Sequence, residues 1–295
     1  SADIDLVVAS TITAIGTNDL YFVRNNGTSV KNELWVLDHS ANSTQANQVT
    51  GINNVITPSL TPVGTNNLYF IRNGGGIMNE LWIVDNVTTA ATTAVVVQDG
   101  GSVDLNDVVA TSLVAVGTAD LFLVRNGPGR VNELWAVEGS VSSIKALVVA
   151  QRVSVVDGAV YKWTQVGATA EYYLELLAGG DPGLALPDFV EINGVDTATQ
   201  GTLASLAVGE WFYGDNGGAL AFDTLFVRIT GDVAPTVSGY VKVGYNVDKL
   251  SVASITSVGS DNVYFVRDDS GVTFANDLWT VKAVGAAPFL AEPVL

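Results

Sequence analysis

The sequence contains no cysteine and a single histidine, His39. The lack of cysteine excludes disulfide bonds and cysteine-ligated metal ions, and one histidine without such partners does not make a zinc site. A Ser-His-Asp triad would have to use His39, and its neighbours in the sequence give it no support. Walker loops and Gly-x-Ser-x-Gly elbows are missing as well. These absences predict a protein that holds no cofactor or metal and is not an enzyme.

Basic residues and long hydrophobic runs are also scarce. The chain has 13 lysines and arginines against 30 aspartates and glutamates, a formal net charge of −17. Phosphate backbones would repel such a chain, which argues against nucleic acid as a partner. Gly, Asn, Asp and Thr interrupt every apolar stretch, so we expect no membrane span. The opening residues 1–5 lack the basic and apolar regions of a signal peptide, which predicts synthesis in a cytosol.

Apolar residues are abundant by contrast, at 48% of the chain against 15% charged residues. Val, Leu, Ala and aromatic residues occur in short alternating groups, which is typical of strands covered on both faces. Excess apolar surface of this kind is often buried by neighbouring subunits. The composition therefore predicts a homo-oligomer, for example a trimer.

A phrase of two parts occurs four times and organises most of the chain. Its first part runs from glycine to arginine, as in Gly16-Thr-Asn-Asp-Leu-Tyr-Phe-Val-Arg24, and its second part is Asn-Glu-Leu-Trp, as at residues 32–35. The copies begin at Gly16, Gly64, Gly117 and Gly259. Repetition of this kind indicates one supersecondary unit that has been copied along the chain. The third and fourth copies are much farther apart than the others, so a different segment is interposed there.

The two parts of each phrase predict the two strands of a hairpin. Setting Arg24 opposite Glu33 places Phe22 beside Trp35 and leaves both faces of the hairpin apolar, so both must be covered. The charged residues would then close the mouth of the hairpin as a cross-strand ion pair. The same pairing is expected for Arg72 with Glu80, Arg125 with Glu133, and Arg267 with Asp277.

The recurring charges and tryptophans allow a second interpretation, in which the arginines and glutamates form a ligand-binding ring and the tryptophans stack on sugars. The partner of each tryptophan is an apolar Phe or Leu in every copy, which favours core packing. The expected core aromatics are Phe22, Trp35, Phe70, Trp82, Trp135, Phe265 and Trp279.

The sequence predicts an all-β protein with four repeated β-hairpin units and an interposed small β domain. The units would be arranged like the blades of a propeller, or as a sandwich or barrel. We expect residues 1–150 to hold repeats one to three and residues 151–245 to form the interposed domain. Residues 246–295 would supply the fourth repeat and complete the first domain.

The interposed segment combines carboxylates with aromatic residues, a pattern found in sugar clefts. A carboxylate pair would suit a glycosidase, and turn carboxylates would suit calcium. The candidate acids are Glu171, Glu175, Glu191, Glu210, Asp215 and Asp223, and the candidate calcium ligands are Asp181, Asp215 and Asp223. Asp181 and Asp215 lie in turn sequences, however, and alternating glutamates on a strand usually face solvent. We therefore expect neither hydrolysis nor a metal site, and carbohydrate stays open as a partner.

Three segments resemble known families. The Leu-Tyr-Phe … Glu-Leu-Trp-Val-x-Asp phrase is similar to bacterial repeats with the signature Glu-Leu-Trp-x-x-Asp-Gly-Thr, although the trailing Gly-Thr is missing after Asp38 and Asp85. Residues 161–228 resemble a small β-module of tailed-bacteriophage virion proteins. The shared motifs include Tyr-Lys-Trp-Thr, Glu-Tyr-Tyr-Leu-Glu, Gly-Gly-Asp-Pro, Gly-Thr-Leu-Ala-Ser-Leu-Ala-Val-Gly-Glu-Trp and Asp-Thr-Leu-Phe-Val-Arg. Residues 2–7 also resemble the opening of many phage head-decoration proteins.

The phage resemblance implies a virion structural protein made in the host cytoplasm. The role expected first is a capsid decoration, or cement, protein that binds and stabilises the head shell, with itself and the major capsid protein as partners. One alternative is a tail fibre or receptor-binding tail subunit that binds carbohydrate. Another is a bacterial surface adhesin, which the Glu-Leu-Trp repeats favour.

Overall fold

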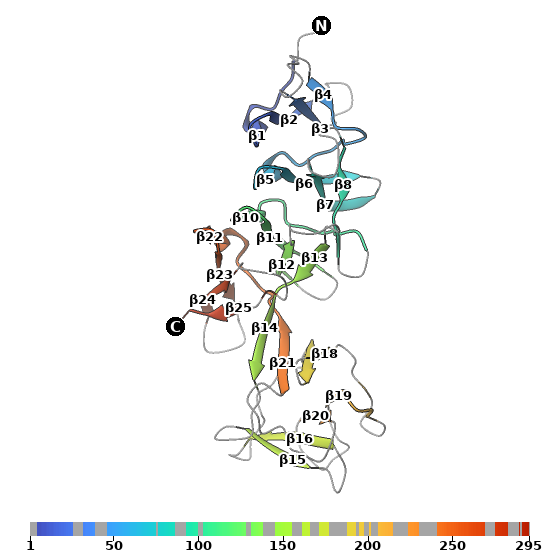
Figure 1. Cartoon of the computed structure of the whole chain (residues 1–295), viewed down its shortest axis with the longest axis vertical. Coiled ribbons are helices and arrows are strands. Elements are labelled where there is room, and N and C mark those ends of the chain that lie inside the picture. The colour runs from blue at the N-terminus through green and yellow to red at the C-terminus, as the bar shows by residue number, and fades with distance from the viewer. Residues whose placement is uncertain are drawn as a thin grey trace. The chain divides into compact units, whose positions relative to one another are not determined.

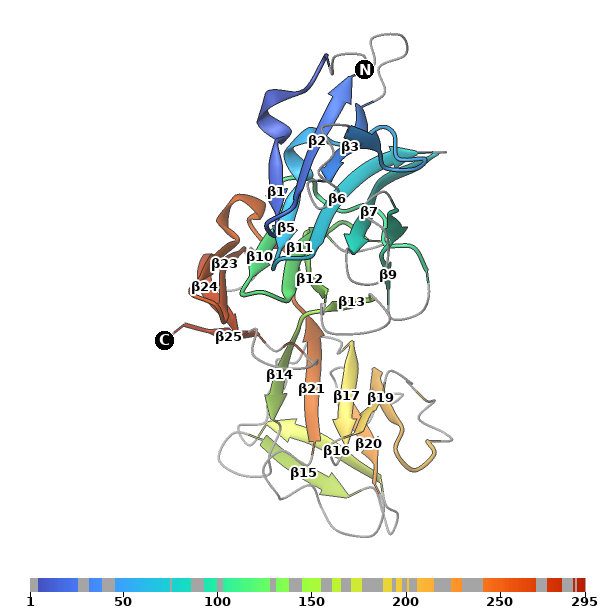
Figure 2. The same cartoon turned by 45° about the horizontal axis from the view of Figure 1, so that its top comes forward.

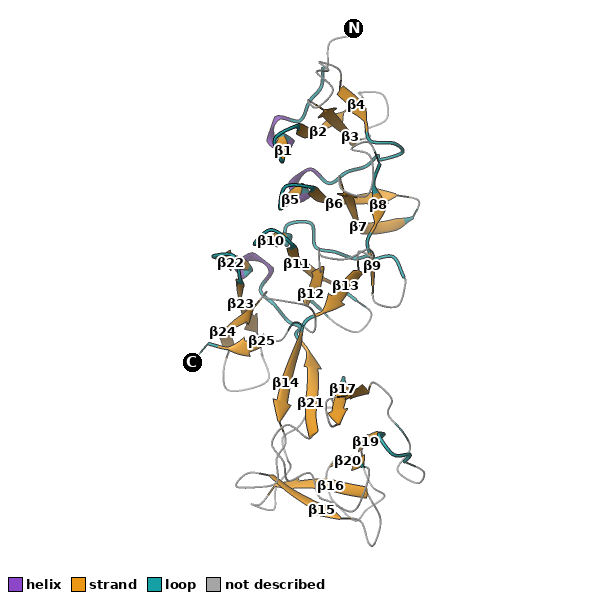
Figure 3. Cartoon of the chain, viewed as in Figure 1, coloured by secondary structure: helices purple, strands orange, loops and turns teal. Residues whose placement is uncertain are grey.

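The computed structural model shows an all-β protein (Figures 1 and 3). It describes residues 5–25, 32–38, 46–74, 76–85, 93–99, 103–127, 131–137, 145–154, 161–165, 171–176, 188–192, 195–197, 201, 206–214, 224–229, 241–268, 275–282, 289 and 291–294. The helical elements in these ranges are short 3-10 turns. None of the helices in the described ranges has the length and apolar character that crossing a membrane requires.

The chain divides into two compact units. Ser1–Val149 and Val247–Leu295 form the first unit, here called the repeat body, and Ala150–Asn246 form the second, the inserted module. These bounds lie within one residue of the domain limits expected from the spacing of the repeats. The chain leaves the repeat body after the third repeat and returns to it before the fourth.

Each repeat is a small sheet whose strands follow one another in chain order and run antiparallel, except for one added parallel strand in repeat 3. Repeat 1 contains η1 (Ala9–Thr11), β1 (Thr13–Ile15), β2 (Asp19–Asn25), β3 (Asn32–Asp38) and β4 (Ala46–Gln48). Repeat 2 contains η2 (Thr57–Ser59), β5 (Thr61–Val63), β6 (Asn67–Gly74), β7 (Ile77–Asp85) and β8 (Val95–Val96). Repeat 3 contains β10 (Val114–Val116), β11 (Asp120–Arg125), β12 (Glu133–Val137) and β13 (Lys145–Val148), with β9 (Gln98–Asp99) parallel to β13. Repeat 4 contains η4 (Val252–Ser254), β22 (Thr256–Val258), β23 (Asn262–Asp268), β24 (Ala275–Lys282) and β25 (Ala291–Pro293).

The hairpin of each repeat has the register that the sequence predicts. Arg24 lies opposite Glu33, and Phe22 lies opposite Trp35. The glycine before each hairpin adopts a positive φ, for example +60° at Gly16, which reverses the chain between β1 and β2. Glycine suits this turn because it reaches the left-handed region without steric cost.

The repeats stack face to face through their apolar side chains. The front face of a repeat is defined by the positions of Tyr21, Val23, Leu34 and Val36, and the back face by those of Leu20, Phe22, Trp35 and Leu37. The front face of repeat 1 shares one core with the back-face residues Leu68, Phe70 and Val84 of repeat 2. The front face of repeat 2 packs in the same way on Leu121, Leu123 and Val137 of repeat 3, and that of repeat 3 packs on Val263, Phe265 and Val281 of repeat 4.

This stacking order settles the architecture of the repeat body. The first strands β1, β5, β10 and β22 lie next to one another in this order (Figures 1 and 2). The sheets therefore follow one another as propeller blades do, and they form neither a sandwich nor a closed barrel.

The inserted module contains two antiparallel sheets that share one core. The first sheet has β14 (Ala150–Ser154), β21 (Val241–Asn246), β17 (Phe189–Ile192) and β18 (Val195–Thr197), in this order. The second has β15 (Tyr161–Gln165), β16 (Glu171–Leu176), β20 (Thr224–Arg228) and β19 (Trp211–Gly214). Trp163, Leu174 and Trp211 of the second sheet pack against Val190 and Val243 of the first.

The module is inserted between two hydrogen-bonded residues that have equivalents in repeats 1 and 2. In repeat 1, the amide of Val49 donates to the carbonyl of Leu34 at 2.8 Å, and the amide of Ile52 donates back to Val49 at 3.1 Å. The same pattern joins Val97, Leu81 and Leu105 in repeat 2, and Val149, Leu134 and Val247 in repeat 3. The intervening chain is Thr50 and Gly51 in repeat 1, residues 98–104 in repeat 2, and residues 150–246 in repeat 3.

Tyr69, on the front face of repeat 2, has a fully buried hydroxyl without a hydrogen-bond partner among the described residues. Burial raises the pKa of this hydroxyl well above its ordinary value of 10.0, and the carboxylates of Asp85 and Asp120 raise it further. Repeat 3 carries Phe122 at the equivalent position, where it is also fully buried. The site therefore accepts a ring without a hydroxyl.

Tyr69→Phe should stabilise the protein by about 1 kcal/mol at pH 7, because it removes a buried polar atom that has no partner. The pKa of Tyr69 is higher in the folded state than in the unfolded state, so the stability of the wild type also depends on pH. Its free energy of unfolding is unaffected by this group below pH 10 and falls as the pH rises towards the folded-state pKa. By pH 11 the advantage of Tyr69→Phe should grow by about 1.4 kcal/mol. Urea unfolding at both pH values measures this. Tyr264→Phe, at the half-buried equivalent position of repeat 4, is the control, and equal pH profiles for Tyr69→Phe and the wild type would contradict the prediction.

Candidate functional site

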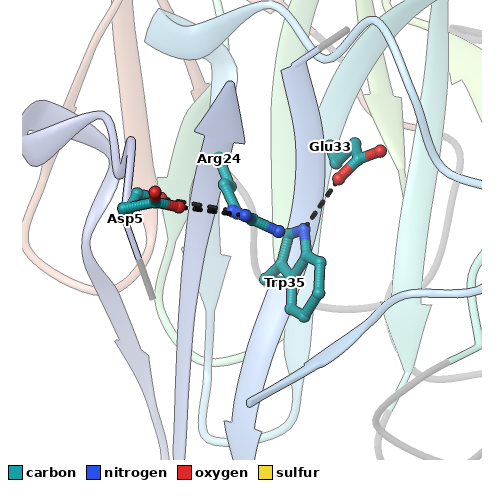
Figure 4. A network of polar contacts seen from close by, with 4 residues as sticks. All are labelled: Asp5, Arg24, Glu33 and Trp35. Carbon is teal, nitrogen blue, oxygen red and sulfur yellow. Dashed lines mark hydrogen bonds and ion pairs between the residues drawn. The ribbon is translucent and has the colours of Figure 1, made fainter. Parts of the chain in front are cut away.

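The candidate site is a charged and aromatic cluster that recurs in every repeat at the mouth of the hairpin. In repeat 1 it comprises Asp5, Arg24, Trp35 and Glu33 (Figure 4). The Arg24 guanidinium carbon lies 5.1 Å from the centroid of the Trp35 ring. Its Nη2 donates to Asp5 Oδ1 at 3.0 Å, and its Nε donates to the Asp5 carbonyl at 3.2 Å. The indole Nε1 of Trp35 donates to Glu33 Oε2 at 3.1 Å.

Local backbone geometry places the acceptor for the arginine. The residue after Asp5 is Leu6, which adopts a φ of +58°, and Val7 then forms a β-bridge with Arg24. The same left-handed residue and bridge recur at Asn54, Asp107 and Lys249, with bridges from Val55 to Arg72, Val108 to Arg125 and Leu250 to Arg267. This turn directs a main-chain carbonyl of the preceding segment towards the guanidinium in repeats 1, 3 and 4.

The other repeats reproduce the stacking of arginine on tryptophan. The guanidinium carbons of Arg72, Arg125 and Arg267 lie 4.9, 5.0 and 5.5 Å from the centroids of Trp82, Trp135 and Trp279. Arg125 Nε donates to the carbonyl of Asn106 at 2.9 Å, and Arg267 Nη2 forms an ion pair with Asp248 Oδ1 at 3.4 Å. Arg72 Nη1 donates to the carbonyl of Gly51 at 3.5 Å. Each arginine therefore holds the segment that leads into its repeat against the hairpin.

The ion pair of the arginine differs from the sequence-based expectation. The register places Arg24 opposite Glu33, but Arg24 forms its ion pair with Asp5, and Glu33 accepts the indole hydrogen of Trp35. Glu80 and Glu133 accept from Trp82 and Trp135 at 2.5 and 2.7 Å in the same way. The expected direct pair fails because a glutamate two residues before a tryptophan on one strand shares its face and reaches its indole nitrogen.

Three of the four repeat tryptophans are also less buried than expected for core residues. Phe22, Phe70, Phe265 and Trp279 are buried, whereas Trp35, Trp82 and Trp135 are half-buried, with an arginine over one ring face. Trp35, Trp82 and Trp135 lie at the rim of the stacked cores, and the arginine covers one ring face on which a sugar would otherwise stack.

Repeat 4 departs from the pattern because Asp277 stands where the other repeats have glutamate. The shorter side chain does not reach the indole, and the buried Nε1 of Trp279 has no hydrogen-bond partner in the part of the chain that the structure describes. Asp277→Glu should supply the missing acceptor and raise the free energy of unfolding by about 1 kcal/mol. Glu133→Asp, which makes the reverse change in repeat 3, should lower it by a similar amount. Denaturant unfolding of both variants tests this, and a loss of stability in Asp277→Glu would contradict it.

Of the candidate acids in the inserted module, Glu191 and Glu210 have structural partners among the described residues. Glu191 is buried and forms an ion pair with Lys242 Nζ at 2.6 Å. Glu210 Oε2 accepts from the amide of Ala207 at 2.8 Å, which closes a turn. Glu171 and Glu175 belong to β16. Asp181, Asp215, Asp223 and His39 lie outside the described residues. Within the described ranges, no three His, Asp or Glu side chains gather to hold a metal ion.

A second repeated contact was missed by the sequence reasoning. A hydroxyl five residues before each anchor glycine accepts from a main-chain amide of the hairpin at 2.8 Å. The pairs are Thr11 with Val23, Ser59 with Ile71, Ser112 with Val124, and Ser254 with Val266. The signal was present in the sequence as a Ser or Thr at a constant distance from Gly16, Gly64, Gly117 and Gly259.

Comparisons with protein-family models and with curated proteins find no match. Among solved structures, the β-propeller domain of the Trilobed protease from Pyrococcus furiosus is 8% identical, with a TM-score of 0.31, and the alignment covers 93% of this chain and 69% of that one. A prolyl endopeptidase structure is 11% identical, with a TM-score of 0.32 and coverage of 96% and 34%. A post-proline cleaving enzyme from Rickettsia typhi is 8% identical, with a TM-score of 0.30 and coverage of 96% and 37%. At these values the likenesses give no support to a peptidase function for this chain.

Proposed function

We propose that this protein is a non-enzymatic structural component of a bacteriophage virion, and specifically a decoration protein that binds and stabilises the head shell. The observation that carries the proposal is that the repeated arginines and glutamates make contacts within the fold. Each of the four arginines lies on a tryptophan ring and holds the connecting segment of its own repeat. The groups that would best form a ligand ring therefore maintain the framework instead.

Two further features favour the virion over other structural roles. The inserted module resembles a β-module of tailed-phage virion proteins along residues 161–228, and its described Glu191 and Glu210 have structural partners. The chain is acidic, at −17, and therefore unsuited to binding the packaged DNA. Assembly in the host cytoplasm onto the outer face of the shell fits both features, with the major capsid protein as the partner.

The proposed mechanism is mechanical. A protein that binds across neighbouring shell subunits adds buried interface that must be broken before the shell opens. Because it binds the intact shell and not the ruptured one, it stabilises the intact state by mass action. No covalent bond is made or broken in this function.

The direct test compares phage particles made with and without the protein. We expect heads to assemble in both cases, and heads without the protein to release DNA at a lower temperature. Adding the purified native protein back should restore the release temperature, and heat-unfolded protein should not. Equal release temperatures, or antibody labelling confined to tails, would overturn the head assignment. Tail labelling would support the receptor-binding alternative.

A further inference from the structure

The front face of repeat 4 lacks the cover that the same face has in the other three repeats. The last residue of the first strand is buried in repeats 1 to 3, as Ile15, Val63 and Val116, but Val258 in repeat 4 is 53% exposed. Leu278 is 45% exposed, whereas its equivalents Leu34, Leu81 and Leu134 are fully buried. Tyr264 and Val266 are half-buried on the same face. The front face of repeat 4 is therefore an exposed apolar surface of the kind that the next repeat covers in repeats 1 to 3.

The turn glycines show the same difference. A Cβ added to Gly16, Gly64 or Gly117 would lie within 2.7 Å of a carbonyl oxygen in the next repeat, that of Thr65, Thr118 or Ser260. Any other residue would place its Cβ too close to this oxygen, so only glycine fits at these positions. Gly259 has an equivalent φ of +69°, but no atom of the described residues, its chain neighbours apart, lies within 4 Å of its added Cβ. Repeat 4 thus has the glycine that contacts the turn of the next repeat elsewhere in the stack, but no such turn faces it among the described residues.

The opposite end of the stack presents the complementary surface. On the back face of repeat 1, Leu20 and Leu37 are half-buried. Their equivalents on the covered back faces are fully buried, namely Leu68, Leu121 and Val263 for Leu20, and Val84, Val137 and Val281 for Leu37. Repeat 1 also carries the Thr17 turn, which is equivalent to Thr65, Thr118 and Ser260.

We propose that the front face of repeat 4 binds the back face of repeat 1 of a second copy of this chain. The reason to choose a second copy is continuity, because the chain already builds this same interface three times between its own repeats. Two copies joined head to tail at both ends would place eight repeats in one ring, which is within the blade numbers of known propellers. Closure by two copies also satisfies the two-fold symmetry typical of dimers.

Charge at the contact fits this arrangement. Between repeats 2 and 3, the carboxylates of Asp85 and Asp120 both raise the pKa of the Tyr69 hydroxyl, so two like charges lie on the two sides of that contact. The equivalent residues across the proposed contact are Lys282 of repeat 4 and Asp19 of the second copy, which have opposite charges.

The proposed contact between copies does not depend on the virion role, and it holds for any function of the chain.

Blocking each face separately tests the proposal. Leu278→Glu blocks the front face and Leu37→Glu blocks the back face, while Val131→Glu, at a 64% exposed position off both faces, is the control. In sedimentation, the wild type and the control should have twice the 30.8 kDa mass of one chain, and each blocked variant alone should fall to the mass of one chain. An equimolar mixture of the two blocked variants should regain the two-copy mass through its one intact contact. A monomeric wild type, a larger polymer, or a mixture that stays monomeric would overturn the proposal.

A second pair of variants separates loss of binding from loss of folding. Gly259→Ala and Gly51→Ala place alanine at φ values of +69° and +73°, and neither added Cβ lies within 4 Å of a described residue other than its chain neighbours. Both should therefore cost a similar amount of folding stability. Only Gly259→Ala would collide with the Thr17 turn of a second copy, so its dimer dissociation constant should rise more than about a hundredfold. Equal dissociation constants for the two variants would overturn the proposal.

Discussion

Gly64→Ala is expected to destabilise the protein by about 3–5 kcal/mol, within the range of severe core defects. The added Cβ would lie 2.4 Å from the carbonyl oxygen of Thr118, a main-chain atom that cannot turn aside as a side chain would. Relief requires that repeats 2 and 3 move apart, which opens the core shared by Tyr69, Ile71 and Leu121. The left-handed φ of +62° adds the ordinary cost of placing alanine there.

Gly51→Ala provides the matched control for this prediction. Its φ is +73°, and its added Cβ meets no other described residue within 4 Å, so the substitution should cost only about 1–2 kcal/mol. Denaturant unfolding of the two variants isolates the contribution of the repeat contact, because the backbone cost is common to both. A Gly64→Ala variant no less stable than Gly51→Ala would show that the repeats do not stack through this turn.

Removal of the inserted module is expected to leave a repeat body that still unfolds in one cooperative transition. Val149 and Val247, at the two ends of the module, are joined by a hydrogen bond of 2.9 Å. The equivalent residues of repeat 1, Val49 and Ile52, are linked by only Thr50 and Gly51. Replacing residues 150–246 with Thr-Gly should therefore close the gap with a turn that the chain already uses.

A slightly wider deletion is the control for this experiment. Replacing residues 149–248 with the same Thr-Gly removes the amide of Val149 that bonds Leu134, and also Asp248, the ion-pair partner of Arg267. This version should lose much of its stability. Both can be followed by tryptophan fluorescence during urea unfolding. A broad, non-cooperative transition in the narrower deletion would contradict the view that the module is an insertion into a complete body.

Much of the fold could be predicted because the repeated phrase encodes local pairing. The register that sets Arg24 opposite Glu33 follows from the alternation of side chains along two adjacent strands, so the hairpins and their two apolar faces were accessible from sequence. The insertion was visible as an interruption in the spacing of the anchor glycines.

The partners of the arginines could not be predicted in the same way. The acceptors Asp5 and Asn106 lie in segments that differ between repeats, and their position depends on a left-handed residue that is Leu6 in one copy and Asp107 in another. Leucine gives no signal of that conformation. The order in which faces stack is also non-local, because both faces of each hairpin are apolar and the sequence does not state which one meets the next repeat.

Thiol labelling of single cysteine variants tests the central claim most directly, since the natural chain has no cysteine. Val63→Cys, Val116→Cys and Val258→Cys place one thiol at the same position of repeats 2, 3 and 4. The stacked arrangement predicts slow labelling of the first two at every protein concentration. It predicts fast labelling of Val258→Cys in dilute solution, and protection of this thiol as the concentration rises and the second copy binds. Equal labelling rates for all three variants, in dilute solution and in concentrated solution, would contradict the account.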